Sequence, residues 1–515
     1  MITIEAVREH ALTAGTAVAV SDGEKSLTWN QLADEITALR SWLTRSLDPD
    51  DRNRAVVVAG NSVRVVAVTA ALTSLGVPWV GVDPARDAAT IREQLESVGP
   101  TLIVFDSALP NLPADFRDRW SDSALLLDMV GFPAFDTRAT HYLGAAGFTA
   151  PAASWQNPPF LTLGFTSGTT GTPKLFVRRR RTENQRVAYL RDRLGFGPGD
   201  SFLITSPLAF ASGHVWVSAA LALGGSVRLG PADPAQALRV LAEERLTGGF
   251  LVPPFLEELL EAAEAAPVRP DLTRLRFLLS GGRHLSPRAV RQSARLLGDV
   301  LHLYYATTET GINSMADPGD LAADPYSSGR FMPGVTVRAL DPESLLPLGT
   351  GHVGQLAIDS AYAMDEYVHR PLDTVQLDGR RHILTSDFGR VDSHGRLYVT
   401  ARSSGDPRAV ETRLDVVRVE GEIKEHPAVL DVCVTGAEDA PEHAIAVLVL
   451  RPELAERAAE QARGHVVAVL DRYTDDSTVV EVSRIPYNSA GKVALRELRD
   501  QGLLRHRTPA DLTAA

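Results

Sequence analysis

The sequence is almost free of cysteine. Its 515 residues contain a single one, Cys433, so neither an internal disulfide framework nor a multi-cysteine metal site can form. Cys433 stands between Val432 and Val434 in a strand-like apolar run. That setting indicates a buried structural thiol rather than a nucleophile.

Long apolar runs and an excess of positive charge are also missing. No apolar run reaches the ~18 residues that a membrane span needs, and the first residues show no basic segment followed by an apolar core. The formal net charge of −12 argues against a general nucleic-acid binder. We therefore expect a cytoplasmic enzyme that binds neither membranes nor nucleic acids, with two or more domains because the chain is too long for one core.

Lysine is scarce. Only four of the 52 Lys and Arg residues are lysine: Lys25, Lys174, Lys424 and Lys492. In a chain that otherwise uses arginine, a retained lysine indicates a need for a flexible point charge rather than a planar fork. Lys174 and Lys492 fall in motif-like strings, whereas Lys25 and Lys424 are expected at the surface.

The first 105 residues alternate short apolar runs with amphipathic stretches. The apolar residues of 28–43 recur at steps of four, three and four, which predicts a helix capped by Thr28. Strands are expected at 54–60, 78–82 and 102–105, and helices at 62–75 and 88–98. This alternation is typical of an α/β domain with a largely parallel sheet. Residues 109–155 show little periodicity and are expected to be connecting structure.

The stretch from Phe165 to Lys174 follows an apolar run at 160–164 that is predicted to be a strand. Seven of its ten residues are Gly, Ser or Thr, and it ends in a lysine. Glycines allow backbone N–H groups to turn inward, hydroxyls add donors, and lysine adds a positive charge, so the block favours a phosphate-binding loop. The spacing is not that of a Walker A loop. By composition alone, a Ser/Thr/Gly surface loop would also fit.

This string resembles the nucleotide loop of the adenylate-forming superfamily, which comprises acyl- and aryl-CoA synthetases, stand-alone adenylation enzymes and luciferases. The usual pattern is T-S-G-T-T-G-x-P-K-G, and only its last glycine is replaced, by Leu175. The resemblance implies that Lys174 and the loop hold the phosphates of ATP. The loop residues concerned are Thr166, Ser167, Gly168, Thr169, Thr170 and Gly171.

Two later strings also resemble motifs of this superfamily. Residues 304–310, Y-Y-A-T-T-E-T, are similar to its Y-G-x-T-E motif. The resemblance implies that Tyr305 stacks near the adenine and that Thr308 bonds the phosphate. It also implies that Glu309 holds Mg²⁺, which takes hard carboxylate oxygens. Around residues 385–402 the chain resembles the T-G-D segment and the arginine that follows it, which implies that Asp387 binds the ribose hydroxyls and that Arg402 lies near the ribose and phosphate.

The acid-binding pocket is expected from two further segments. In the superfamily an aromatic residue or histidine in the region of 207–214 lines this pocket, and Phe210 fits that role, while His214 is either a pocket donor or a structural residue. The stretch holds no Asp of the kind that binds an α-ammonium group, which disfavours an α-amino acid substrate. The turn at Gly282 resembles one that approaches adenine and acyl group. Arg283 faces either the substrate or the solvent.

A basic run follows the phosphate loop at residues 178–181, all arginine. Two interpretations are open. The run is either a solvated basic face or a landing site for a phosphate-bearing partner such as coenzyme A or the phosphopantetheine arm of a carrier protein.

The C-terminal part begins after a linker-like stretch at 403–409, where Asp406 is the candidate hinge residue by resemblance. Where relatives carry a glycine-rich loop that lines the pantetheine tunnel, this chain has V-E-T-R-L-D at 410–415. That departure puts the thioester half-reaction in question. Strands are expected at 416–419, 432–434, 444–450 and 479–482. A P-x-x-x-x-G-K-like string presents Lys492 at a tight turn.

The motifs together imply a large α/β domain at 1–402 with mainly parallel sheets and flanking helices. A hinge at 403–409 and a small mobile α+β domain at 410–515 would complete the chain. The resemblance implies a two-step ligase in which ATP and Mg²⁺ activate a small carboxylic acid, aryl or short acyl, with Lys492 and Lys174 acting as positioned charges.

Three questions stay open at this point. The default acceptor is the thiol of coenzyme A or of a separate carrier protein, but a non-thiol acceptor such as an amine, or an unusual oxyacid in place of the carboxylate, is also compatible. A nucleotide-binding protein without turnover is the alternative from another class. A kinase-like enzyme lacks any accompanying kinase motif.

Overall fold

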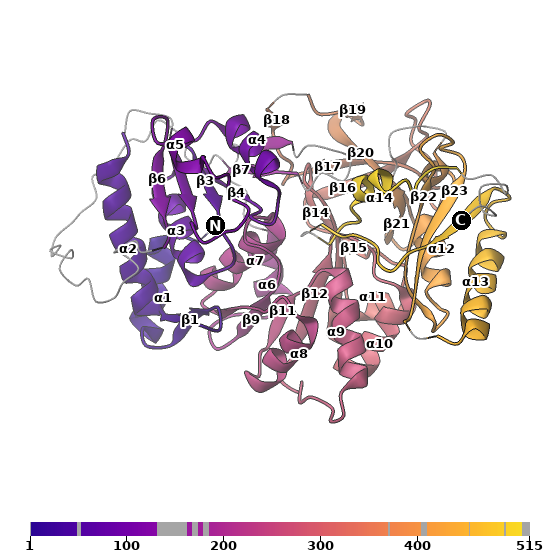
Figure 1. Cartoon of the computed structure of the whole chain (residues 1–515), viewed down its shortest axis with the longest axis horizontal. Coiled ribbons are helices and arrows are strands. Elements are labelled where there is room, and N and C mark those ends of the chain that lie inside the picture. Colours follow the sequence, from indigo (N-terminus) through magenta and orange to yellow (C-terminus); the bar gives the residue numbers. More distant parts are fainter. Residues whose placement is uncertain are drawn as a thin grey trace.

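The computed structural model describes residues 2–48, 53–130, 162–166, 174–178, 185–368, 371–402, 409–452, 454–488 and 491–506. In Figure 1 the N-terminal part lies at one end of the molecule and the C-terminal domain at the other, with the middle of the chain between them. Within these ranges, no helix is both long and apolar enough to cross a bilayer.

A four-stranded parallel sheet, in the order β4–β3–β5–β6, forms one layer of the N-terminal part. Every residue of β3, β4 and β5 is buried, as expected for a parallel sheet covered on both faces. The expected strands and helices of residues 54–105 are confirmed, with small differences at their ends. The elements are β3 (Ala55–Val58), α3 (Val63–Ser74), β4 (Trp79–Val82), α4 (Ala88–Val98), β5 (Leu102–Phe105), α5 (Phe116–Trp120) and β6 (Leu125–Asp128).

A nine-stranded sheet forms the centre of the large domain, in the order β15-β14-β13-β12-β11-β9-β10-β1-β2. The strands from β13 to β1 pair in parallel. Its strands are β1 (Val18–Ser21), β2 (Ser26–Thr28), β9 (Ser201–Ile204), β10 (Ser226–Leu229), β11 (Gly248–Phe250), β12 (Phe277–Gly281), β13 (Leu301–Thr307), β14 (Gly311–Ala316) and β15 (Arg330–Phe331). Because the carboxyl ends of parallel strands share one edge, the segments that follow β12 and β13 come close together.

Helices flank this sheet, and the predicted one at 28–43 is α2, which continues to Ser46. Thr28 caps it as expected: its hydroxyl accepts from Gln31 N, and the Gln31 side chain accepts from Thr28 N. The helices of this part are α1 (Ile4–Ala14), α2 (Trp29–Ser46), α6 (Gln185–Asp192), α7 (Ala211–Ala222), α8 (Pro234–Glu243), α9 (Pro253–Ala265), α10 (Pro287–Leu297) and α11 (Pro318–Ala323).

Two antiparallel sheets complete the large domain. One has the order β16-β17-β20-β19 with β21 paired to β20, and the other the order β18-β8-β7. Their strands are β7 (Thr162–Phe165), β8 (Leu175–Arg178), β16 (Val335–Leu340), β17 (Gly354–Ser360), β18 (Glu366–Tyr367), β19 (Thr374–Leu377), β20 (Arg380–Val391) and β21 (Leu397–Arg402). The two ends of the predicted phosphate loop therefore belong to a β7–β8 hairpin.

The C-terminal domain packs helices on a three-stranded sheet, in the order β22-β23-β24. Its elements are η2 (Val410–Thr412), α12 (Val416–Ile423), β22 (Val429–Gly436), β23 (Ala444–Leu450), α13 (Glu456–Leu470), β24 (Ser477–Glu481) and α14 (Leu495–Asp500). The expected strands at 432–434, 444–450 and 479–482 are confirmed as parts of this sheet.

The expected strand at 416–419 is wrong, because these residues begin helix α12. Their β-branched side chains suggested a strand, but two helical features prevail. Asp415 caps the helix by accepting a hydrogen bond from Arg418 N at 3.0 Å. Val416, Val419 and Ile423 recur at steps of three and four and are buried against the C-terminal sheet.

Candidate active site

A cavity of about 990 Å³ opens between the large domain and the C-terminal domain. The ends of β12, β13, β20 and β21 form its large-domain wall, and η2, α12, β22 and the segment at Lys492 form the opposite wall. Most of the described candidate residues of the sequence line it: Thr166, Lys174, Gly282, Arg283, Tyr305, Thr308, Glu309, Asp387, Arg402 and Lys492.

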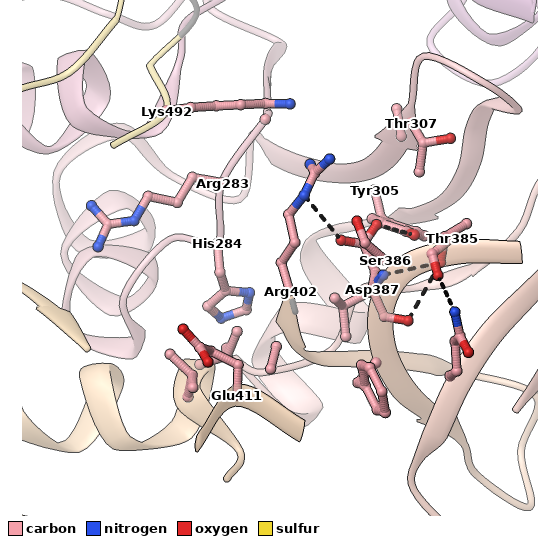
Figure 2. Close-up of a pocket in the computed structure, with 18 of the residues that line it drawn as sticks. Arg283, His284, Tyr305, Thr307, Thr385, Ser386, Asp387, Arg402, Glu411 and Lys492 are labelled. Carbon is pink, nitrogen blue, oxygen red and sulfur yellow. Dashed lines mark hydrogen bonds and ion pairs between the residues drawn. The ribbon is translucent and has the colours of Figure 1, made fainter. Parts of the chain in front are cut away.

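Asp387 and Arg402 lie opposite each other on paired strands β20 and β21. Tyr305, from β13, donates its hydroxyl to Asp387 Oδ2 at 2.7 Å, and Arg402 Nε lies 3.8 Å from Asp387 Oδ1. Figure 2 shows these side chains gathered at one side of the cavity. The carboxylate of Asp387 raises the pKa of Arg402, and burial raises the pKa of Tyr305. The three residues form a polar, mutually bonded patch.

Thr308 and Glu309 lie in the turn between β13 and β14. Thr310 N donates to Thr307 Oγ1 at 3.1 Å, and Met364 N donates to the Glu309 carbonyl at 2.8 Å, which together fix the turn. The hydroxyl of Tyr367 donates to Glu309 Oε1. The turn therefore presents a positioned carboxylate, a hard oxygen donor that fits Mg²⁺ shared with nucleotide phosphates.

The ends of the predicted phosphate loop meet beside this turn. Thr166 N donates to the Lys174 carbonyl at 3.0 Å, and Lys174 N donates to Thr166 Oγ1 at 3.0 Å. Lys174 is exposed to the cavity. The other candidate residues of the loop lie outside the described residues, and so does the hinge candidate: Ser167, Gly168, Thr169, Thr170, Gly171 and Asp406.

Lys492 reaches the same cavity from the C-terminal domain. Gly491 precedes it with a φ of 74°, a left-handed conformation that glycine adopts without strain, and Lys492 N donates to Asn488 Oδ1 at 3.1 Å. Burial lowers the pKa of Lys492 to about 8; the charge of Arg402 also lowers it, while Asp387 and Glu309 raise it. In Figure 2 its ammonium group points toward the Arg402 guanidinium.

The sequence left open whether Arg283 faces the substrate or the solvent, and the structure shows where its side chain lies. Arg283 follows Gly282, whose φ is 105°, and it is a half-buried residue that lines the cavity. Its guanidinium bonds the C-terminal domain: Nη2 donates to Glu420 Oε2 at 3.1 Å and to the Val432 carbonyl at 2.8 Å. Nη1 bonds the Tyr487 hydroxyl and lies 3.6 Å from Asp431 Oδ1.

Lys424, which was expected at the surface, is buried with 4% of its area exposed. Its ammonium bonds Glu257 of the large domain and lies 3.3 Å from Asp431 Oδ1. The expectation failed because both partners are distant in sequence. Lys424 and Arg283 thus belong to one set of buried and half-buried polar residues between the domains, which we call the interdomain cluster: Glu257, Arg283, Glu420, Lys424, Asp431 and Tyr487.

Neither Phe210 nor His214 is among the described residues that line this cavity. Phe210 stands at the start of α7, and the half-buried His214 bonds the Leu208 carbonyl through Nδ1 at 3.2 Å. Burial lowers the pKa of His214 to about 4. An aromatic row joins α7 to the cavity wall: Trp216 stacks on Phe250 at 6.0 Å, and Phe250 stacks on the cavity-lining Tyr304 at 5.8 Å. A pocket role for Phe210 or His214 stays a prediction.

Sequence reasoning missed two cavity residues, His284 and Glu411. They come from opposite domains: His284 follows β12 and is half-buried, and Glu411 lies in η2 and is buried. Glu411 falls in the segment that departs from the superfamily, which was the one available signal. Cys433 is buried, as expected, and burial raises the pKa of its thiol.

One group of potential metal ligands lies away from this cavity, among the described residues of the C-terminal domain. Ligand atoms of His443, Asp476 and His506 come within 4.8 Å of one another. Both ring nitrogens of His443 are already hydrogen-bonded, to Asp476 at 2.6 Å and to Thr478 at 2.7 Å. That bonding gives the histidine a structural role.

Comparison with known proteins matches residues 7–368 to the model of the AMP-binding enzyme family. A salicylyl-CoA synthase / salicylate adenylyltransferase from a Streptomyces species is 27% identical over 526 residues, which covers 96% of this chain and 92% of that protein. The medium/long-chain-fatty-acid–CoA ligase FadD8 of Mycobacterium tuberculosis is 27% identical over 377 residues. That match covers 69% of this chain but only 65% of the relative's length.

Among solved structures, the amide bond synthetase McbA from Marinactinospora thermotolerans superimposes with a TM-score of 0.78. It is 25% identical, and the match covers 97% of this chain and 99% of that chain. The fold, the order of the motifs and the family match agree: the chain belongs to the AMP-binding enzymes, the adenylate-forming superfamily.

Proposed function

We propose that this protein activates a carboxylic acid with ATP. A carboxylate oxygen attacks the α-phosphorus of ATP, the bond to the β-phosphate breaks, and an acyl-adenylate and pyrophosphate result. The observation that carries the proposal is the meeting of Lys492, from the C-terminal domain, with Thr308, Glu309, Asp387 and Arg402 in one cavity. The resemblance to adenylate-forming enzymes assigns the roles that follow.

The nucleotide side of the cavity offers fitting groups for each part of ATP. Asp387 would accept hydrogen bonds from the ribose hydroxyls, with Tyr305 beside the adenine and Arg402 near the ribose and α-phosphate. Thr308, Thr166, Lys174 and the loop at 167–171 would hold the phosphates. Mg²⁺, held by Glu309, would neutralise phosphate charge.

Lys492 would supply positive charge where negative charge develops between the carboxylate and the α-phosphate. A positioned charge in a site shielded from water stabilises a transition state more than the same charge in water does. The lysine must be protonated for this role. Lys492 comes from the C-terminal domain, so its role depends on how that domain is placed. The proposal therefore includes a large domain at 1–402, a hinge at 403–409 around Asp406, and a mobile domain at 410–515.

The acid is proposed to be aryl or short acyl rather than an α-amino acid. No aspartate stands in the segment 207–214 to pair with an ammonium group. Phe210, His214 and Gly282 are the candidates to border the acid. The salicylate-activating relative supports an aryl acid, although an unusual small oxyacid fits the same chemistry.

The acceptor has two candidates in the comparisons. Relatives named as CoA ligases support a thiol, from coenzyme A or a separate carrier protein, and the solved amide bond synthetase supports an amine. A protein that binds nucleotide without turnover is the alternative from another class; the presence of Glu309 and Lys492 opposes it.

The test is pyrophosphate release from ATP and Mg²⁺ with a panel of aryl, short acyl and amino acids. We expect release that depends on an aryl or short acyl acid. If no acid in the panel stimulates release above the level with ATP alone, the proposed activity is refuted.

A further inference from the structure

On the C-terminal wall of the cavity, the carboxylate of Glu411 has one oxygen that accepts hydrogen bonds and one that has no partner among the described residues. Glu411 Oε1 accepts from the Thr435 hydroxyl at 2.7 Å and from Gly436 N at 3.0 Å. Oε2 is buried and has no hydrogen-bond partner among the described residues, and the side chain as a whole is 7% exposed. A buried carboxylate oxygen without a donor is unfavourable, so a donor supplied by a bound molecule would stabilise it.

The large-domain wall holds a second such atom. His284 Nε2 is also buried without a partner in the described part of the chain. The ring bonds the backbone of Pro325, which has only a carbonyl to offer, so Nδ1 carries the proton and Nε2 is an acceptor. Burial and the nearby charge of Arg283 lower the pKa of His284 to about 4, which keeps the ring neutral.

The two residues that carry these acceptors, His284 and Glu411, line the cavity that Lys492 also lines. In the view of Figure 2, His284 and Glu411 lie on one side of Arg402, and Tyr305 and Asp387 on the other. Two acceptors require a ligand with at least two strong donors. An amine nitrogen has them, whereas a thiol has a single weak S–H donor.

The interdomain cluster keeps these walls together while Lys492 is in the cavity. Burial by itself would lower the pKa of Arg283, but Glu420 and Asp431 raise it well above its usual range. Arg283 is the residue next to His284, and its partner Asp431 lies two residues before the cavity-lining Cys433 in β22. A molecule bound between His284 and Glu411 thus touches both domains.

We propose that this corner of the cavity is the acceptor site of the second reaction step, that the acceptor is a small primary amine, and that Glu411 receives its proton. The amine nitrogen attacks the acyl carbon of the adenylate. A C–N bond forms, the bond from carbon to the phosphate oxygen breaks, and AMP leaves with the electron pair. The proton lost by nitrogen passes to Glu411 Oε2, and the product is an amide. This inference rests on the proposed formation of the adenylate.

The experiment supplies the whole protein with ATP, Mg²⁺ and the acid that stimulates pyrophosphate release most. Ammonia, methylamine, benzylamine or coenzyme A is added in turn, and pyrophosphate and acyl product are both quantified. We expect amides with at least one amine and little thioester. The measured quantity is the ratio of amide formed to pyrophosphate released.

The decisive variant is Glu411→Gln, which keeps an oxygen acceptor for Thr435 and Gly436 and removes the proton acceptor. We expect the ratio of amide to pyrophosphate to fall by about 10²-fold, with the loss in kcat for the amine rather than in its KM. The matched control is Glu425→Gln, which changes an exposed carboxylate on the same domain face that pairs with Arg291. This control should leave the ratio unchanged.

Three results separate the possibilities. Efficient thioester formation with no amide from any of the amines would overturn the amine site and leave acid activation standing. An unchanged ratio in Glu411→Gln would overturn the role of Glu411. No acid-dependent pyrophosphate release in the unaltered protein would overturn the proposed function, and this inference with it.

Discussion

The two walls of the cavity differ in how their polar groups are satisfied. On the nucleotide side, Tyr305, Asp387 and Arg402 bond one another within the large domain. On the side facing the C-terminal domain, Arg283 bonds across the interface, while His284 and Glu411 each keep one buried acceptor without a described partner. The polar groups of the first wall are bonded within the large domain. The second wall combines residues of both domains and therefore depends on their docking.

This difference suggests that the two walls serve different steps of the reaction that we propose. A wall whose groups are fixed by each other is preorganised for its ligand, which we propose to be ATP. A wall made by docking, with vacant acceptors, is where one enzyme of the superfamily can differ from another. We therefore assign adenylate formation to the first wall together with Lys492, and the choice of acceptor to the second.

Of the variants considered, removal of the Lys492 side chain should reduce acid-dependent pyrophosphate release the most. In Lys492→Ala the charge from the C-terminal domain disappears while the nucleotide wall is untouched, and we expect acid-dependent pyrophosphate release to fall by about 10³-fold. Nucleotide affinity, measured by calorimetry with AMP, should change little. Release near the normal rate would remove Lys492 from the mechanism.

Breaking the interdomain cluster should cause the next largest loss of pyrophosphate release. Arg283→Met leaves the half-buried carboxylates of Glu420 and Asp431 without their guanidinium partner, which weakens docking by about 3 kcal/mol. We expect pyrophosphate release to fall by roughly 10²-fold, because Lys492 would then spend less time in the cavity.

Arg291 provides the matched control for this variant. It also pairs across the interface, with Glu425, but both side chains are largely exposed. Exposed pairs contribute only about 0.2–1 kcal/mol, so Arg291→Met should change release less than about twofold. Equal effects of the two variants would show that the buried cluster has no special role in docking.

Glu309→Gln probes the nucleotide wall through its metal. The amide keeps the bond with Tyr367 but is a poorer ligand for Mg²⁺. We expect the Mg²⁺ concentration needed for half-maximal release to rise by roughly tenfold. A titration with Mg²⁺ at fixed ATP measures it, and an unchanged midpoint would count against a metal at Glu309.

The pH profile should give the smallest but most specific change. The pKa of Lys492 is lowered to about 8 by burial, so the residue is charged below that pH and loses its proton above it. We expect kcat/KM for release to decline above pH 8. Since the charge of Arg402 also lowers this pKa, Arg402→Gln should move the decline to higher pH. A decline at the same pH in both proteins would exclude Lys492 as its source.

The large-domain wall of the cavity could be predicted from the sequence because its residues lie in short motifs. Tyr305 lies near the end of β13, Thr308 and Glu309 lie in the turn that follows, and Asp387 and Arg402 face each other on adjacent strands. Local spacing there fixes spatial proximity. The structure brings each of these residues to the same cavity, as the resemblance implied.

The wall of the cavity that combines residues of both domains could not be predicted in the same way. Arg283 and Glu420 are 137 residues apart, and Lys424 and Glu257 are 167 apart. No local pattern reports such pairs, and the sequence therefore predicts a surface position for Lys424, which is in fact buried. The failure at 416–419 is local instead: β-branched residues favour a strand, but the Asp415 cap and apolar steps of three and four decide for a helix.

The measurement that tests the central claim most directly is the exchange of labelled pyrophosphate into ATP. It reports adenylate formation without any acceptor, and therefore examines the nucleotide wall and Lys492 alone. We predict exchange that requires both Mg²⁺ and an aryl or short acyl acid and that is lost in Lys492→Ala. Exchange that is equally fast without the acid, or that persists in Lys492→Ala, would contradict this account.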